Sequence, residues 1–313
     1  MKNLIKRKLV REEERMVNDK SKRIYLYDYR YTTGQNLNSE DAEYVKNLKI
    51  PNKINNDSLV IFPKGNKVLF TYLDTKGRSI RAYSKKEIIK GFEGKYKRLR
   101  SFKKNYGPIV DRIIKDIRSP DPRIAQSALV LYIIYTTGLR IGSNADTRAE
   151  VKAHGISTLL SKHVKLIAPD KVKLDFIGKK GVRNTTLIKD PLIYNELRKR
   201  KSTQRNAPIF DFSHNIVRKY LQGLDGRYVI KDFRTLKANQ IAEELVKKRK
   251  GPAPNETTFK KWQLEVAAKV ADELGNTRSV ALNDYIDPKI WARWRKPEWG
   301  IWKPKRFIMN GDE

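Results

Sequence analysis

The sequence predicts an α+β protein with a β-rich N-terminal lobe, residues 1–105, and a mainly α-helical second lobe, residues 106–313. Two observations carry this prediction. Short apolar runs separated by turn residues fill the first part of the chain, whereas longer apolar stripes at helical spacing fill the second part. The change occurs near Tyr106-Gly107-Pro108. A chain of 313 residues is also long enough to form two domains rather than one.

The first lobe is expected to hold a small, mostly antiparallel sheet within residues 23–85. Candidate strands contain Ile24 and Leu26 and cover residues 59–62, 68–72 and 80–83. Gly, Pro, Asn and Asp cluster between these strands, as is typical of turns. Residues 1–22 are highly charged and nearly without pattern, so we expect a frayed helix or an arm there.

Residues 95–104 alternate basic side chains with aromatic and apolar ones. Two compatible interpretations are open for this segment. It is a solvated linker or helix face, or it is a strap that contacts phosphates while it connects the lobes.

Local signals predict the helices of the second lobe. Asp121-Pro122 fits an N-cap followed by proline at the first helical position, and Gly138 fits the end of the same helix. Residues 124–135 are apolar almost all round, which is typical of a helix at the centre of a domain. Asp190-Pro191 and Ser213 resemble caps of two further helices. An apolar stripe closed by Gly275 predicts a core helix; its members are Phe259, Trp262, Val266, Val270 and Leu274.

One small hairpin is expected within this helical lobe. Residues 171–177 alternate apolar and polar side chains, and they can pair with residues 182–188 across the turn 178–181. The tail beyond Pro288 places Trp291, Trp294, Trp299 and Trp302 among basic residues. Core packing is the favoured role for these tryptophans, and stacking or phosphate contact is the alternative.

The charge balance favours a polyanionic partner. Lys and Arg number 68 against 35 Asp and Glu, a formal net charge of +33 that is spread over folded segments. Nucleic acid is the first candidate, and an acidic membrane surface or a lysine-rich soluble surface is the alternative. The chain has no cysteine and three histidines without metal-ligand spacing, so we expect no metal site. With no signal-peptide pattern and no long apolar run, we expect no membrane association and an intracellular location, in cytoplasm, nucleoid or virion.

One tyrosine and three basic residues in distinctive settings predict phosphodiester chemistry. Tyr285 lies near the C-terminal end, Arg140 and Arg234 lie upstream, and Lys179 sits in the predicted hairpin turn. A phenol can attack phosphorus, while arginine forks neutralise the non-bridging oxygens and a lysine protonates the leaving oxygen. No Walker-type glycine loop occurs, so neither ATP nor another cofactor is indicated. Each residue alone also fits an ordinary structural role, and only the combination points to catalysis.

The combination resembles a known family. Residues 137–143, 176–179, 231–235 and 274–288, in this order, resemble the catalytic set of type IB DNA topoisomerases, and most of all their small poxvirus-like and bacterial branch. In the first lobe, residues 48–51 and 75–78 extend the resemblance. It implies a C-shaped clamp, formed by a β-rich lobe and a helical catalytic lobe, that closes as a monomer around double-stranded DNA.

The resemblance also implies a role for each motif residue. Arg140 and Arg234 would hold the phosphate, Lys179 would be the general acid, and Tyr285 would form a 3′-phosphotyrosyl link. Many members have histidine where this chain has Asn276, so we interpret Asn276 as a substituted, neutral phosphate ligand. Lys180, next to Lys179, is an alternative proton donor. Expected DNA contacts outside the catalytic set are Arg81, Tyr83, Lys180 and Lys231.

Two other functions are compatible with parts of this pattern. A tyrosine recombinase or integrase shares the catalytic set, but such enzymes usually carry histidine three positions before the second arginine, where this chain has Lys231. They also usually have a helical N-terminal domain and keep histidine at the position of Asn276. A non-catalytic DNA-binding protein that kept the fold is the second alternative, and the intact catalytic set argues against it.

Overall fold

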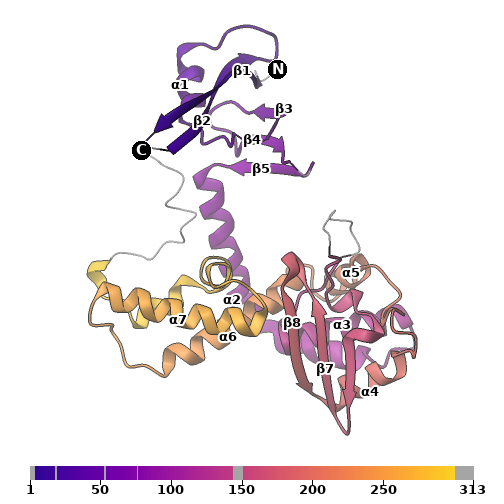
Figure 1. Ribbon diagram of the computed structural model, residues 1–313. Coiled ribbons are helices and arrows are strands. Elements are labelled where there is room, and N and C mark those ends of the chain that lie inside the picture. The colour runs from indigo at the N-terminus through magenta and orange to yellow at the C-terminus, as the bar shows by residue number, and fades with distance from the viewer. Residues whose placement is uncertain (1–3, 18–19, 53, 76, 144–150, 300–313) are drawn as a thin grey trace. The chain divides into compact units, whose positions relative to one another are not determined.

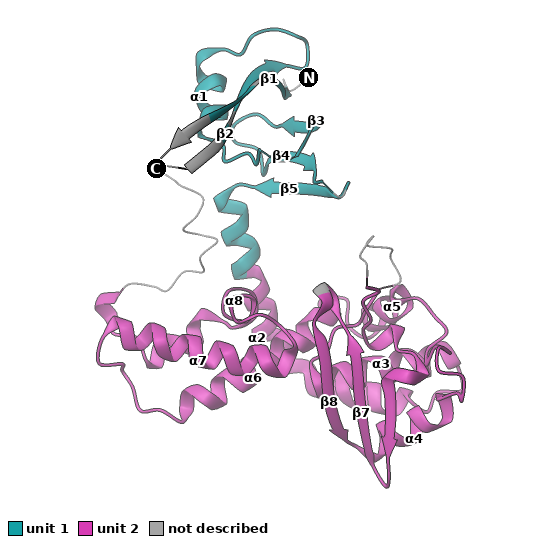
Figure 2. Cartoon of the chain, viewed as in Figure 1, with its two compact units in different colours: residues 1–93, 306–313 teal, residues 94–305 magenta. Residues whose placement is uncertain are grey.

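The computed structural model describes residues 4–17, 20–52, 54–75, 77–143 and 151–299 (Figure 1). The chain divides into two compact units, residues 1–93 and residues 94–305 (Figure 2). Both sheet and helix are present, so the predicted α+β class is confirmed. The boundary lies within helix α2 (Lys85–Asp116), which continues through Pro108. The expectation that helical structure begins after residue 106 was therefore wrong, since α2 begins at Lys85.

The first unit contains a five-stranded antiparallel sheet, the helix α1 (Ser39–Asn47) and the first turns of α2. Its strand order is β2-β1-β3-β4-β5, with bounds Lys20–Tyr31, Ile5–Val17, Asn55–Ile61, Val68–Leu73 and Ser79–Tyr83. The predicted strands are confirmed. The expectation of a frayed helix or arm over residues 1–22 was wrong, because most of this segment is β1.

Two buried residues anchor β1 in the sheet. Ile5 pairs with Ile61, and both side chains are fully buried. The guanidinium of Arg7 is also buried, and its Nε donates a hydrogen bond to Asn56 Oδ1 at 2.8 Å. The core of this unit consists of Ile5, Tyr31, Val45, Leu59, Ile61 and Phe70. A charged residue thus occupies an interior position. The alternation of apolar and polar residues that usually indicates a strand is therefore interrupted in β1.

The second unit is mainly helical. After α2 come α3 (Pro122–Thr137), α4 (Pro191–Arg200), α5 (His214–Leu224), α6 (Ile230–Lys247), α7 (Glu256–Leu274) and α8 (Arg278–Val280). The predicted caps are confirmed: Asp121, Asp190 and Ser213 each accept a hydrogen bond from a backbone N–H of the first turn. Gly138 and Gly275 end α3 and α7 with left-handed backbone, φ 71° and 57°.

A small antiparallel sheet, in the order β6-β7-β8, completes the second unit. The predicted hairpin is confirmed as β7 (Lys171–Ile177) and β8 (Arg183–Lys189). The third strand, β6 (Val164–Ile167), was not predicted because four residues are too few to show a clear alternation. The hairpin turn between Ile177 and Arg183 carries Lys179.

The basic segment 95–104 is part of α2, so the expectation of a helix face is confirmed. Several of its cations have partners within the second unit. Arg98 makes a bidentate pair with Asp232 of α6, at 2.9 and 3.1 Å, and Arg100 pairs with Asp287 at 2.9 Å. These contacts fasten α2 to α6 and to the chain that follows Tyr285. Phosphate contact by this segment stays a prediction.

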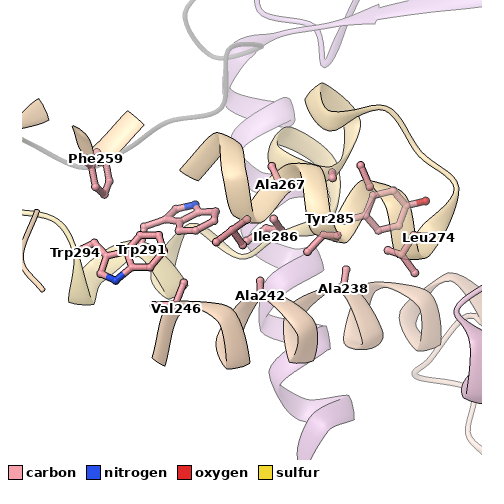
Figure 3. Packing of buried hydrophobic residues seen from close by; sticks show 14 of the residues in the cluster. Ala238, Ala242, Val246, Phe259, Ala267, Leu274, Tyr285, Ile286, Trp291 and Trp294 are labelled. Atoms are coloured by element: carbon pink, nitrogen blue, oxygen red, sulfur yellow. The ribbon is translucent and has the colours of Figure 1, made fainter. Parts of the chain in front are cut away.

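The apolar stripe of α7 packs against α6 and the C-terminal segment (Figure 3). Trp291 and Trp294 are fully buried in this cluster, and Trp299 packs against it, so the core-packing interpretation is confirmed for these three. Trp302 lies outside the described residues. Tyr285 belongs to the same cluster, and Figure 3 shows its hydroxyl oxygen pointing away from the tryptophans.

Substitution of Trp294 by alanine tests the importance of this core. Its ring is fully buried and makes an edge contact with Trp262 at 5.2 Å between centroids. We expect Trp294→Ala to lower the free energy of unfolding by about 3–5 kcal/mol in urea titrations. Leu264→Ala is the control, because Leu264 lies on α7 and is 38% exposed. Similar losses in the two variants would contradict this assignment of the core.

Candidate active site

A cavity of about 1090 Å³ lies within the second unit. Its walls come from the end of α3 and the loop after it, the β7–β8 turn, α5, the start of α6, and Tyr285. Eight lining residues carry basic side chains: Arg140, Lys152, His154, Lys179, His214, Arg218, Lys231 and Arg234. Among the lining residues that the structure describes there is no aspartate or glutamate. Such a cavity suits an anionic ligand.

Arg234 is the buried centre of this site, with only 3% of its surface exposed. Its Nε donates to Tyr285 Oη at 3.2 Å, Nη2 donates to the carbonyl of Leu274 at 2.5 Å, and Nη1 donates to the carbonyl of Gly138. Burial lowers the pKa of Arg234 to about 10, and the charge of Arg140 acts in the same direction. The guanidinium is still charged at neutral pH. Two of its five N–H groups are left for a ligand.

Tyr285 is held from several sides. Its side chain is 6% exposed, and the ring centroid lies 5.3 Å from Lys231 Nζ and 5.2 Å from the guanidinium carbon of Arg234. Its carbonyl accepts a hydrogen bond from Asn239 Nδ2 at 2.8 Å. Ile286 N donates a hydrogen bond to Ala281 O. This bond closes a wide, π-type helical turn, Ala281–Tyr285, which brings Tyr285 to the cavity wall. Wide helical turns of this kind are frequent at functional sites.

Arg140 and Asn276 are directly connected. Arg140 Nη1 donates to the carbonyl of Gly275 at 3.1 Å, and Nη2 donates to Asn276 Oδ1. The Nδ2 group of Asn276 is buried, and no acceptor among the described residues lies within hydrogen-bonding distance of it. Because Oδ1 is engaged by Arg140, the amide presents Nδ2 as an unused donor.

Backbone pairing brings the segments around the cavity together. Ile156 N donates to Arg140 O at 2.9 Å, and His154 N donates to Ile177 O at 2.8 Å. The loop that carries Arg140 therefore lies against the segment that carries His154, which lies against the end of β7. Close approach of Gly142 and Gly155 permits this: a Cβ on Gly155 would lie 2.3 Å from Gly142 N.

Lys179 is exposed and directly follows Gly178 in the hairpin turn. It lines the cavity together with Arg140, Lys231, Arg234 and Tyr285. The structure thus brings the predicted tyrosine, arginines and lysine to one place, and it attaches Asn276 to Arg140. The side chain of Lys180, the alternative proton donor, lies outside the described residues.

The two predicted DNA contacts of the first lobe belong to the other compact unit. Arg81 and Tyr83 are exposed on one face of β5, the edge strand of the first unit. Their role stays a prediction. Lys231, predicted as a DNA contact, lies at the start of α6 and lines the cavity.

The sequence analysis missed four basic residues of the cavity, namely Lys152, His154, His214 and Arg218. His214, Arg218 and Gln222 are spaced by four along α5, so they share one helix face, and that spacing was the available signal. Lys152 and His154 lie in a segment without periodicity, and only the fold brings them to the site. His154 Nδ1 lies 2.7 Å from the carbonyl oxygen of Thr158. Because a carbonyl oxygen only accepts hydrogen bonds, Nδ1 carries the proton, and this bond does not use Nε2.

Within the described ranges, no group of three or more histidine, aspartate and glutamate side chains is placed to hold a metal ion. None of the helices in those ranges combines the length and apolar character needed to cross a membrane.

His163 predicts a pH dependence of stability. Its ring packs 4.5 Å from that of His154, and Nδ1 accepts a hydrogen bond from Leu160 N. Burial lowers the pKa of His163 to about 4, aided by His154 and Lys162. The unfolded chain binds this proton first, near its ordinary pKa of about 6.5. We therefore expect stability to fall as pH decreases from about 6.5 toward about 4.

Urea midpoints at pH 7 and pH 5 test this expectation. The His163→Gln variant lacks the titrating ring and should lose less stability than wild type over the same interval. An equal loss in both proteins would show that other groups cause the dependence.

Comparison with known protein families gives a match over most of the second unit. A family model described as the catalytic core of eukaryotic DNA topoisomerase I matches residues 86–291. DNA topoisomerase 1 of Caenorhabditis elegans is 28% identical over 210 residues, which is 62% of this chain and 24% of that protein. DNA topoisomerase 1 of Schizosaccharomyces pombe is 33% identical over 158 residues, which is 49% of this chain and 19% of that protein.

The human DNA topoisomerase 1 is 26% identical over 170 residues, covering 51% of this chain and 22% of the human protein. The chain thus spans about a fifth to a quarter of the length of the curated relatives it matches. All of these relatives are eukaryotic, so the comparison supports the family and not the small poxvirus-like and bacterial branch.

Proposed function

The chain belongs to the family of the eukaryotic DNA topoisomerase I catalytic core, and from this we propose that it relaxes supercoiled duplex DNA as a type IB topoisomerase. The reaction is transient cleavage of one strand through a 3′-phosphotyrosyl intermediate, without ATP. The observation that carries the proposal is the position of Tyr285, which is hydrogen-bonded to Arg234 at the wall of a cavity lined by basic residues.

In the cleavage step, Tyr285 Oη attacks phosphorus as the phenolic proton leaves to solvent. A tyrosyl O–P bond forms and the P–O5′ bond breaks. Lys179 donates a proton to the departing 5′ oxygen, which leaves as a hydroxyl. Its exposure and its position in the hairpin turn favour it for this role. The new phosphodiester keeps the energy needed for rejoining, so the free 5′-hydroxyl reverses the step after the strand has swivelled.

The negative charge that develops on the non-bridging oxygens requires fixed donors. We assign this role to Arg140, Arg234 and the Nδ2 group of Asn276. Each donor aimed at such charge contributes about 3–4 kcal/mol, or about 10²–10³ in rate. Arg234 retains two N–H groups beyond those bound to the protein, and Asn276 retains Nδ2. Donors fixed before substrate binds need no rearrangement during the reaction.

Binding of duplex DNA is proposed to proceed mainly through phosphates, with the two units closing as a monomeric, C-shaped clamp. The formal charge of +33 supports this mode, which makes affinity fall steeply with salt concentration. Arg81, Tyr83, Lys180 and Lys231 are the proposed contacts outside the catalytic set. Within the family we place the chain in the small poxvirus-like and bacterial branch, because residues 48–51 and 75–78 resemble that branch and lie outside the matched region.

The nucleophile is tested with an end-labelled, nicked duplex and a denaturing gel. Wild type should form a covalent adduct and relax a supercoiled plasmid in the presence of EDTA, and Tyr285→Phe should do neither. Tyr194→Phe, on α4 and outside the cavity lining, is the control that should match wild type. An adduct formed by Tyr285→Phe would refute the assignment, and strand exchange between two defined sites without relaxation would indicate a recombinase.

A series at Asn276 tests the neutral donor. We expect Asn276→Ala to slow single-turnover cleavage by about 10²-fold or more, since it removes one donor to the phosphate. Asn276→His supplies an N–H and should stay active. Asn276→Asp keeps the shape and the bond with Arg140 but lacks the donor, so it should be at least as slow as the alanine variant. Equal cleavage rates for Asn276→Ala and wild type would remove Asn276 from the site.

A further inference from the structure

Asn184, on β8, lies between two glycines that neighbour proposed catalytic residues. Its side chain is buried, with 6% of the surface exposed. A Cβ added to Gly178 would lie 2.4 Å from Asn184 Nδ2, and a Cβ added to Gly275 would lie 2.3 Å from Asn184 Oδ1. The carboxamide thus fills the space that a side chain at either glycine would take. Gly178 directly precedes Lys179, and Gly275 directly precedes Asn276.

The amide is also fixed within the hairpin. Asn184 Nδ2 donates to the carbonyl of Val182 at 2.9 Å, and the same carbonyl accepts from Gly178 N at 2.8 Å. One carbonyl therefore holds both the backbone before Lys179 and the side chain of Asn184. The other end of the amide lies against Gly275. The position of the turn and the position of the end of α7 therefore depend on each other.

The backbone at Gly178 shows that contact with Asn184, rather than chain conformation, excludes a side chain there. Its φ of −100° is available to any residue. Beyond the Asn184 side chain, the nearest atom to an added Cβ is Val182 O at 3.4 Å, which is an ordinary contact. Gly275 differs, since its φ of 57° favours glycine for a separate reason.

We propose that Asn184 is a positioning residue that fixes the turn carrying Lys179 relative to the segment carrying Asn276. This inference rests on the proposed function. Lys179 must reach the 5′ oxygen of the same phosphate whose non-bridging oxygens are held by Asn276 and Arg140. A displacement of about 1 Å in such an arrangement costs about 10²-fold in rate. Asn184 acts through Lys179 and does not itself contact the DNA.

The leaving group of the substrate distinguishes positioning of the general acid from general support of the fold. In a 5′-bridging phosphorothiolate the departing atom is sulfur, which leaves as a thiolate with an ordinary pKa of about 8.5 and needs no proton donor. We expect Asn184→Ala to slow cleavage of the ordinary duplex by about 10²-fold. On the phosphorothiolate duplex its rate should lie within about 10-fold of wild type, as should that of Lys179→Ala.

A double variant tests the contact itself. Gly178→Ala introduces a methyl group against Asn184 Nδ2 and should slow cleavage of the ordinary duplex in the same substrate-dependent way. In the Gly178→Ala/Asn184→Ala protein the methyl group has room, so the double variant should cleave no more slowly than Asn184→Ala alone. Additive losses in the double variant would overturn the proposed contact, because mutations at independent sites add.

The outcomes separate the two proposals. If wild type forms no adduct with either duplex, the proposed function fails and this inference fails with it. If wild type cleaves both duplexes but Asn184→Ala matches it on the ordinary duplex, only the inference is wrong. Equal slowing of Asn184→Ala on both duplexes also overturns it, since that pattern indicates a purely structural role. Gly178→Ala gives an independent reading should Asn184→Ala fail to fold.

Discussion

The buried guanidinium of Arg234 is the interaction on which the site depends. A buried charge is tolerated only when it is well hydrogen-bonded, and Arg234 donates to the carbonyls of Gly138 and Leu274 and to the phenol of Tyr285. Both carbonyls lie at helix C-termini, where carbonyl groups lack intrahelical partners and the helix dipole is negative. One cation therefore joins the ends of α3 and α7 to Tyr285, and it satisfies groups that the helices leave open.

The scaffold around this cation fixes Tyr285 through its backbone as well. Asn239 of α6 donates to the carbonyl of Tyr285, and its Oδ1 accepts from Asp287 N at 2.7 Å. On the other side, Tyr96 Oη of α2 donates to the carbonyl of Ile286 at 2.7 Å. Side chains of α2 and α6 thus form hydrogen bonds with the backbone of the two residues that follow Tyr285. A phenol held in this way loses little conformational entropy when it meets a substrate, which is the advantage of preorganisation.

The sequence predicted those features that are encoded locally. Asp121, Gly138 and Gly275 specify helix ends through caps and left-handed turns, which need no tertiary contact to be recognised. Strand β1 was missed because the buried Arg7 interrupts the apolar alternation, and the start of α2 was missed because the change to helical structure was set at Tyr106-Gly107-Pro108, which lies inside the helix. His154 and Asn184 reach the site through contacts with residues distant in sequence. No spacing rule within the chain could have found them.

Repulsion between the cations of the cavity destabilises the free protein, and this destabilisation favours the binding of an anion. Arg140 and Arg234 are close enough for the charge of Arg140 to help lower the pKa of Arg234, and none of the lining residues within the described ranges carries a carboxylate that would offset this repulsion. In the free protein the buried charge of Arg234 lies near that of Arg140, and this repulsion lowers the stability of the fold. An anion between them removes that penalty. The benefit increases as negative charge grows on the anion, so the same repulsion that weakens the free protein would favour the most highly charged state of the proposed reaction.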